Sequence, residues 1–206
     1  CIVLNVLEIH WAWPLSIASS LLYGWLFFAS RLYGEAGLQL FFVAVSAWGW
    51  WQWLYGRRAG AARPGPLRVA VLAAAARWQV LGGWMLAWPL LALLLARFTD
   101  TDVPWLDAFP TVGSVIGQLL LGRKFLENWA VWVVVNVFSV ALFAYKGLWL
   151  TALLYLLFVA LAVVGWLRWR AMLRGRIAAQ AGSGAGTAAD AVAAGADADA
   201  DADADA

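Results

Sequence analysis

Residues 127–169 read ENWAVWVVVNVFSVALFAYKGLWLTALLYLLFVALAVVGWLRW, which is two long apolar runs separated by Lys146 and Gly147. A helix that crosses a bilayer needs about 20 predominantly apolar residues, and each run reaches that length. The charged residues Glu127, Lys146 and Arg168 stand at the ends of the runs, where the chain leaves the hydrocarbon. The sequence therefore predicts two membrane-spanning helices, at 128–146 and 148–170.

The rest of the chain is also predominantly apolar. Of its 206 residues, 65% are hydrophobic and only 13% are charged, whereas a soluble domain carries about 25% charged residues. Further apolar segments lie at 1–10 (the remnant of a first helix), 13–30, 35–55, 79–97 and 107–122. We therefore predict an all-α integral membrane protein, a bundle of seven transmembrane helices in the lipid bilayer.

The composition excludes several functions. The net charge is only +2 and the arginines cluster at segment ends, so we expect no nucleic-acid partner. With Cys1 as the single cysteine and His10 as the single histidine, the chain cannot build a Cys/His metal site or an internal disulfide. Enzymes need a carboxylate cluster, a metal or a nucleophile with its base. We expect no catalytic residue, no metal, no cofactor and no enzymatic activity.

An internal repeat organises the chain. Shifting the sequence by 116 residues lays 11–53 on 127–169 without a gap, and thirteen of the 43 positions are identical. The most specific match is Gly49-Trp50-x-x-Trp53 with Gly165-Trp166-x-x-Trp169. Such parallel repeats, joined by a linker helix, are a known transporter architecture. The chain is predicted to comprise a first three-helix repeat at 1–55, a cytoplasmic connector at 56–78, a linker helix at 79–97 and a second three-helix repeat at 107–170.

The basic residues predict the orientation, because short cytoplasmic loops are enriched in Lys and Arg. They gather in three loops that alternating helices place on one side: Arg57, Arg58, Arg63 and Arg68; Arg123 and Lys124; Arg168, Arg170, Arg174 and Arg176. The C-terminus is therefore predicted to be cytoplasmic. The tail at 177–206 is predicted to be disordered, because from Gln180 onward it is an Ala/Gly/Asp segment with no large apolar residue to bury.

Polar residues inside the bilayer should face the bundle interior or a cavity, because burial in lipid is costly. One stripe runs down the fifth segment and another down the sixth: Asp107, Thr111, Ser114 and Gln118; Trp129, Trp132, Asn136 and Ser139. On the third segment Gln39 shares a face with Ser46, and Tyr155 is the repeat mate of Gln39.

These polar groups have two interpretations. Serines such as Ser46 and Ser139 are typical of hydrogen bonds that hold membrane helices together. Full amides are harder to satisfy between two helices, and with nearby aromatic rings they favour a cavity for a planar, uncharged or cationic ring. The sixteen tryptophans are also consistent with interfacial belts. The predicted substrate-binding residues are Gln39, Ser114, Gln118, Trp129, Trp132, Asn136 and Tyr155. Because no central span carries an acid, we expect facilitated diffusion without ion coupling.

Several motifs resemble the PnuC vitamin transporters: Trp13-Pro14-Leu15-Ser16-Ile17, Gly49-Trp50-Trp51-Gln52-Trp53, Asp107-Ala108-Phe109, Ser114-Val115-Ile116-Gly117-Gln118, Glu127-Asn128-Trp129-x-x-Trp132 and Tyr145-Lys146-Gly147-Leu148-x-Leu150-Thr151. The resemblance implies a SWEET-like fold of three plus one plus three helices and a homotrimer in the bacterial inner membrane. It also implies uptake of nicotinamide riboside by alternating access, with the substrate trapped by phosphorylation. Thiamine, riboflavin or a deoxynucleoside remain alternative substrates, and a structural or receptor-like membrane protein is the alternative of another class.

Overall fold

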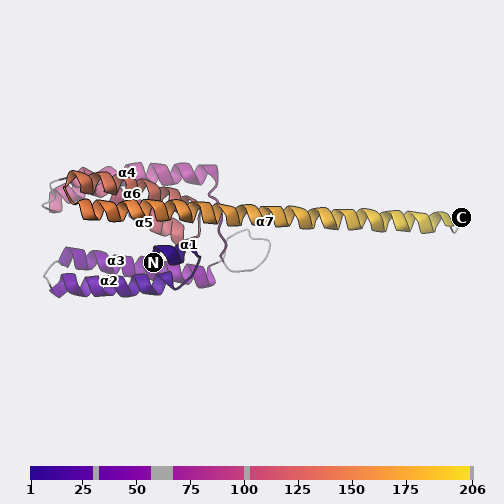
Figure 1. The fold of residues 1–206 in the computed structure, drawn as a ribbon, viewed down its shortest axis with the longest axis horizontal. Coiled ribbons are helices and arrows are strands. Elements are labelled where there is room, and N and C mark those ends of the chain that lie inside the picture. The colour runs from indigo at the N-terminus through magenta and orange to yellow at the C-terminus, as the bar shows by residue number, and fades with distance from the viewer. Residues whose placement is uncertain (30–32, 57–66, 100–102, 205–206) are drawn as a thin grey trace. The chain divides into compact units, whose positions relative to one another are not determined.

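The computed structural model describes residues 1–29, 33–56, 67–99 and 103–204, and this part of the chain is helical (Figure 1). The helices, in chain order, are α1 (Ile2–Val6), α2 (Ala12–Ala29), α3 (Tyr33–Tyr55), α4 (Ala74–Phe98), α5 (Pro104–Gly122), α6 (Glu127–Tyr145) and α7 (Trp149–Ala204). The predicted helical class is thus confirmed, and the bounds of α2 to α6 lie close to those predicted from hydropathy.

Four of these helices are long and apolar enough to cross a membrane by length and composition: 12–29, 74–98, 127–145 and the 149–179 part of α7. In α5, proline stands in the first turn, where its missing N–H costs nothing. The polar stripe of α5 explains why its sequence is less apolar than that of α6, since the stripe faces a cavity described below. The protein is a multi-pass membrane protein.

The first helix is shorter than the predicted segment 1–10. Helix α1 ends at Val6, and Glu8 adopts a positive φ of 56°. That conformation costs a residue with a side chain about 1–2 kcal/mol, and it turns the chain sharply toward α2. The helical prediction failed here because hydropathy does not report the backbone of a single turn.

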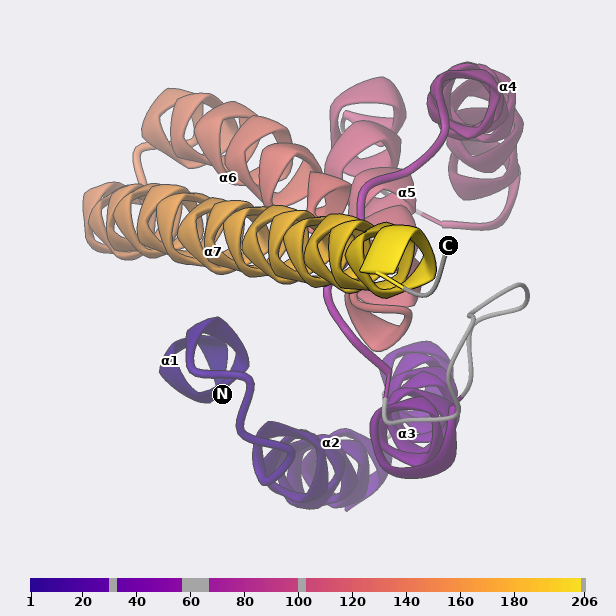
Figure 2. The same ribbon diagram turned by 90° about the vertical axis from the view of Figure 1, so that its right-hand side faces the viewer.

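Most of the helix contacts join helices that are neighbours in the sequence. Helix α2 packs on α3, and α5 packs on both α4 and α6; Figure 2 shows α5 between those two helices. Helices α3 and α5 also contact each other, at the end where both finish: the indole of Trp53 donates a hydrogen bond from Nε1 to the carbonyl oxygen of Leu121 at 3.0 Å.

Two glycines allow equivalent tryptophans to approach a helix closely. A Cβ on Gly49 of α3 would lie 2.4 Å from the ring of Trp13, and a Cβ on Gly165 of α7 would lie 2.6 Å from the ring of Trp129. Real Cβ atoms essentially never come so near another atom. Each of these tryptophans then meets a second tryptophan edge to face, Trp13 with Trp53 and Trp129 with Trp169, with centroids 5.6 and 5.4 Å apart.

The connector that leads into α4 is attached to the turn between α5 and α6. Ala70 pairs with this turn through two backbone hydrogen bonds, from its own N–H to the carbonyl of Lys124 and from the N–H of Leu126 to its carbonyl, at 3.0 and 2.9 Å. The carboxylate of Glu127 accepts from the N–H of Leu72 and from the guanidinium of Arg77. Glu127 is therefore a structural anchor. Residues 57–66 of the predicted connector, with three of its arginines, lie outside the described residues.

Helix α7 continues as a separate unit, residues 170–206, and is helical to Ala204. The sequence predicts disorder from 177 onward. Alanine has the highest helix propensity of any residue, which explains the helical form. A helix with no apolar face to pack is marginal in water, so disorder of the tail in solution stays a prediction.

Candidate functional site

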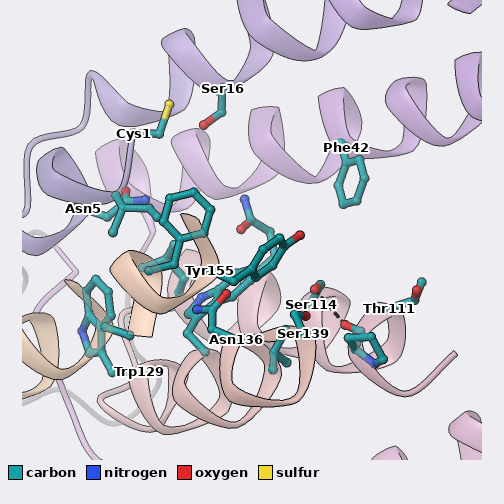
Figure 3. Close-up of a pocket in the computed structure, with 18 of the residues that line it drawn as sticks. Cys1, Asn5, Ser16, Phe42, Thr111, Ser114, Trp129, Asn136, Ser139 and Tyr155 are labelled. Atoms are coloured by element: carbon teal, nitrogen blue, oxygen red, sulfur yellow. Dashed lines mark hydrogen bonds between the residues drawn. The ribbon is translucent and has the colours of Figure 1, made fainter. Parts of the chain in front are cut away.

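A cavity of about 520 Å³ lies among the helices. Its walls come from both halves of the chain, and Figure 3 shows Ser16 and Phe42 facing it from the side opposite Ser114 and Thr111. The lining residues are Cys1, Ile2, Asn5, Trp13, Ser16, Phe42, Asp107, Pro110, Thr111, Ser114, Gln118, Leu121, Trp129, Trp132, Val135, Asn136, Ser139, Leu142, Phe143, Tyr155, Phe158 and Ala162.

The polar stripe of α5 faces this cavity. All four of its members, Asp107, Thr111, Ser114 and Gln118, are lining residues. Two hydroxyls donate to carbonyls one turn earlier in the same helix, Thr111 to Asp107 at 2.7 Å and Ser114 to Pro110 at 2.8 Å. Each of these hydroxyls has its proton engaged and presents lone pairs to the cavity. Gln118 adds an amide near the end where α5 finishes.

The aromatic and polar face of α6 also lines the cavity. Trp129, Trp132, Asn136 and Ser139 all contribute, and Asn136 and Ser139 are buried. Burying a full amide without partners is costly, and a cavity that admits a polar solute or water offsets that cost. Tyr155 of α7 lines the same cavity and is labelled with Asn136 in Figure 3.

Packing fixes the two tryptophans of α6 in different ways. Trp129 is almost wholly buried, held between Gly165 and Trp169, and its Nε1 is buried without a hydrogen-bond partner among the described residues. Trp132 lies against Gly117 of α5, where a Cβ would be 3.1 Å from its ring. Trp129 therefore presents a rigid edge to the cavity, while Trp132 is positioned against the polar helix α5.

Six of the seven predicted binding residues share this cavity: Ser114, Gln118, Trp129, Trp132, Asn136 and Tyr155. Gln39 is not among the lining residues. Its Cβ faces α2, 3.3 Å from where a Cβ of Gly24 would stand. The pairing of Gln39 with Tyr155 as repeat mates did not predict a shared environment, because the cavity extends further into the second half of the chain.

The cavity has one acidic side chain. Asp107, in the first turn of α5, lines it and lies 3.5 Å from Nζ of Lys146 through its Oδ1. No Lys, Arg or His is among the lining residues that the structure describes. The lining is therefore suited to a neutral or cationic solute and unsuited to an anion.

Three lining residues were not predicted as binding residues: Asn5, Phe42 and Phe158. Asn5 lies in α1, and its Oδ1 is buried without a hydrogen-bond partner among the described residues. Phe42 and Phe158 are apolar residues of α3 and α7 and carry no polar signal. Only Asn5 could have been found from the sequence, as an amide within the apolar run 2–7.

The fold and this amphipathic cavity define a membrane transporter for a small molecule rather than an enzyme. Comparison with known proteins gives the family. The sequence profile of the nicotinamide mononucleotide transporter family matches residues 1–171, and the chain belongs to this family.

The curated relatives are transporters. The chain is 30% identical over 191 residues to the nicotinamide riboside transporter PnuC of Escherichia coli (strain K12), an alignment that covers 82% of this chain and 80% of that protein. It is also 30% identical over 166 residues to the riboflavin/roseoflavin transporter RibM of Streptomyces davaonensis, with 78% and 76% covered. A crystal structure of the vitamin B3 transporter PnuC matches with a TM-score of 0.64 at 23% identity, over 84% of this chain and 77% of that one.

Proposed function

We propose that this protein takes up nicotinamide riboside across the bacterial inner membrane by facilitated diffusion with alternating access. The observation that carries the proposal is the lining of the cavity, which combines amides, indoles and one carboxylate with no basic side chain among its described members. The nicotinamide ring of the riboside is a planar cation, and its ribose carries hydroxyls. Indole faces attract such a ring, and Asn136 and Gln118 offer both donors and acceptors.

Riboflavin is the second candidate. The relative that carries riboflavin is as similar in sequence as the one that carries nicotinamide riboside, and riboflavin also joins a planar ring to a chain that bears hydroxyls. The two solutes differ in charge, because the flavin ring is neutral. Asp107 in the cavity favours the cation.

We further propose that the substrate is held by Ser114, Gln118, Trp129, Trp132, Asn136 and Tyr155, which share the cavity. Losing an amide partner from a desolvated site costs about 1–3 kcal/mol. Asn136→Ala and Gln118→Ala should therefore weaken binding about fivefold to a hundredfold. Trp132→Ala should do at least as much.

The architecture that we propose is two parallel three-helix repeats joined by α4. Its support is the set of contacts that recur with a shift of 116 residues: Trp13 on Gly49 and Trp129 on Gly165, each with an edge-to-face tryptophan. The positions of the basic loops support a cytoplasmic C-terminus. The resemblance to PnuC transporters supports a homotrimer.

The test is uptake by proteoliposomes that are offered nicotinamide riboside, riboflavin, thiamine and thymidine in parallel, with no ion gradient. We expect nicotinamide riboside to equilibrate fastest, without accumulating above equilibrium. Calorimetry on Asn136→Ala and Trp132→Ala then tests the site, with Ser46→Ala as the control because Ser46 is buried in α3 but is not a lining residue. Unchanged affinity in both site variants would show that the substrate binds elsewhere.

Two further measurements address orientation and assembly. A reporter fused to the C-terminus should be active in the cytoplasm, and activity only in the periplasm would reverse the proposed topology. Native mass spectrometry from detergent should give three copies, and a monomer at all concentrations would contradict the trimer.

A further inference from the structure

The turn from α1 to α2 and the turn from α5 to α6 share the same pattern of backbone hydrogen bonds. In the first, the N–H of Ile9 donates to Leu4 at 2.8 Å; in the second, that of Phe125 donates to Leu120 at 3.0 Å. These residues are 116 positions apart, as are the members of the next pair of bonds, Glu8 to Asn5 at 3.1 Å and Lys124 to Leu121 at 2.9 Å. The structural equivalence thus extends beyond the part of the repeat that the sequence reveals.

Glu8 and Lys124 are the equivalent residues at the centre of these turns. Both have positive φ, 56° and 53°, and they are the only non-glycine residues of the described chain that do. This backbone conformation favours glycine. A long charged side chain stands at both positions despite that preference, which indicates that the side chains themselves have a use.

The side chains of Glu8 and Lys124 point toward each other, one from each half of the chain. Nζ of Lys124 lies 3.9 Å from Oε1 of Glu8, and both side chains are largely buried. The same Nζ lies 4.4 Å from the ring centroid of Trp53, close enough for a cation–π contact. Trp53 in turn bonds to Leu121 and contacts the ring of Trp169. One carboxylate, one ammonium group and two indoles therefore close this end of the molecule between its two halves.

This closure lies directly next to the cavity. Asn5 and Leu121, whose carbonyls accept the hydrogen bonds of the two turns, are both lining residues, and so are Trp13 and Trp129, which follow the turns. The Glu8–Lys124 pair therefore joins the two halves of the chain at this end of the cavity. The basic loops make this the proposed cytoplasmic end.

We propose that Glu8 and Lys124 are the cytoplasmic gate of the transporter, an ion pair formed by two equivalent residues of the two repeats. The inference rests on the proposed transport function and orientation. The pair suits a gate because its closed form gains charge attraction in a poorly hydrated site. Its open form exposes both charges to water, which solvates them well.

The experiment uses a cysteine at Ser139, which is buried and lines the cavity, in a Cys1→Ser background because Cys1 is itself exposed. In inside-out vesicles, a membrane-impermeant maleimide reaches Ser139→Cys from the cytoplasmic side only when the gate is open. Glu8→Lys and Lys124→Glu each set like charges against each other, and we expect each to raise the labelling rate about tenfold. The exchange Glu8→Lys/Lys124→Glu should return the rate to within about twofold of the parent, because the two turns have the same backbone.

Two more variants keep the result interpretable. Glu8→Gln, which removes one charge without adding a like one, should raise labelling by a smaller factor even if the reversed charges prevent folding. Arg77→Gln is the matched control, since the Arg77–Glu127 pair is on the same side but joins α4 to α6 within one half of the chain. Labelling at the parental rate in all single variants, or no recovery in the exchange, would overturn the gate. No substrate is present, so an error in the proposed substrate leaves this test unaffected.

Discussion

Trp53 and Trp169, 116 positions apart in the chain, contact each other with ring centroids 6.5 Å apart and planes inclined at 49°. They occupy equivalent places in the two halves, yet their indole nitrogens differ. Nε1 of Trp53 donates to the carbonyl of Leu121, whereas Nε1 of Trp169 is buried without a hydrogen-bond partner among the described residues. Of these two equivalent indoles, Trp53 thus contributes a hydrogen bond, and Trp169 contributes none among the described residues.

This inequality predicts a difference between two identical substitutions. Trp53→Phe removes a buried donor and leaves the Leu121 carbonyl with one partner fewer, whereas Trp169→Phe removes a donor that has no partner among the described residues. Both changes lose the same ring volume, so Trp53→Phe should lower the free energy of unfolding by about 1–3 kcal/mol more than Trp169→Phe does. Thermal unfolding in detergent micelles measures both, and each variant is the control for the other. Equal losses would contradict the assigned hydrogen bond.

The tryptophan–glycine contacts predict a second effect on stability. Gly49→Ala and Gly165→Ala place a methyl group inside the contact distance of an indole ring, and such overpacking costs about 1–3 kcal/mol. Gly82→Ala in α4 is the control, because nothing lies within 4 Å of its Cβ position. That change should be neutral or stabilising by up to about 1 kcal/mol, since alanine has the higher helix propensity. If Gly82→Ala lost as much stability as Gly49→Ala and Gly165→Ala, the loss could not be attributed to the tryptophan contacts.

Asn5 predicts an effect on affinity without an effect on stability. Its Oδ1 is a buried acceptor that lines the cavity and has no hydrogen-bond partner among the described residues, so a bound solute is a natural donor to it. Asn5→Ala should weaken binding about fivefold or more. The same change should leave the unfolding midpoint unchanged or slightly raised, because an unpaired buried polar group is lost. Calorimetry and thermal unfolding on the same sample separate the two quantities, and normal affinity would exclude the contact.

Asp107 predicts selectivity by charge. Asp107→Asn should weaken binding of the cationic nicotinamide riboside about two- to fivefold, the range for a partly exposed charge pair, and leave neutral riboflavin unaffected. Lys146→Gln removes the cation 3.5 Å from Asp107 and should act in the opposite direction on the riboside. Competition binding at low and at high salt measures both changes. An equal loss for the two solutes would mean that Asp107 acts through structure and not through charge.

Hydropathy and residue spacing predicted the helices well, because each span must satisfy its backbone internally over a fixed thickness. The stripe from Asp107 to Gln118 and the face from Trp129 to Ser139 were predicted to face the interior, and both line the cavity. Spacing alone sufficed there, since residues three and four apart in a helix share a face.

The rest depended on contacts that no local pattern encodes. Gln39 has the composition of a cavity residue, but its Cβ faces Gly24, and only the packing of α2 on α3 determines that. Glu8 and Lys124 lie just before the stretch over which the two halves match in sequence, and they differ in identity. Their equivalence lies in φ and in hydrogen bonding, and a comparison of residue identities counts such a pair as a mismatch.

The attachment of Ala70 and Leu72 to the turn between α5 and α6 has a mechanical consequence. These contacts and the packing of α4 on α5 join the linker helix to the second half of the chain. A rearrangement that preserves them carries α4, α5 and α6 as one rigid body, against which α2 and α3 can move. Probes placed on α2 and α6 would therefore report each turnover, whereas a pair on α4 and α6 would keep a constant distance.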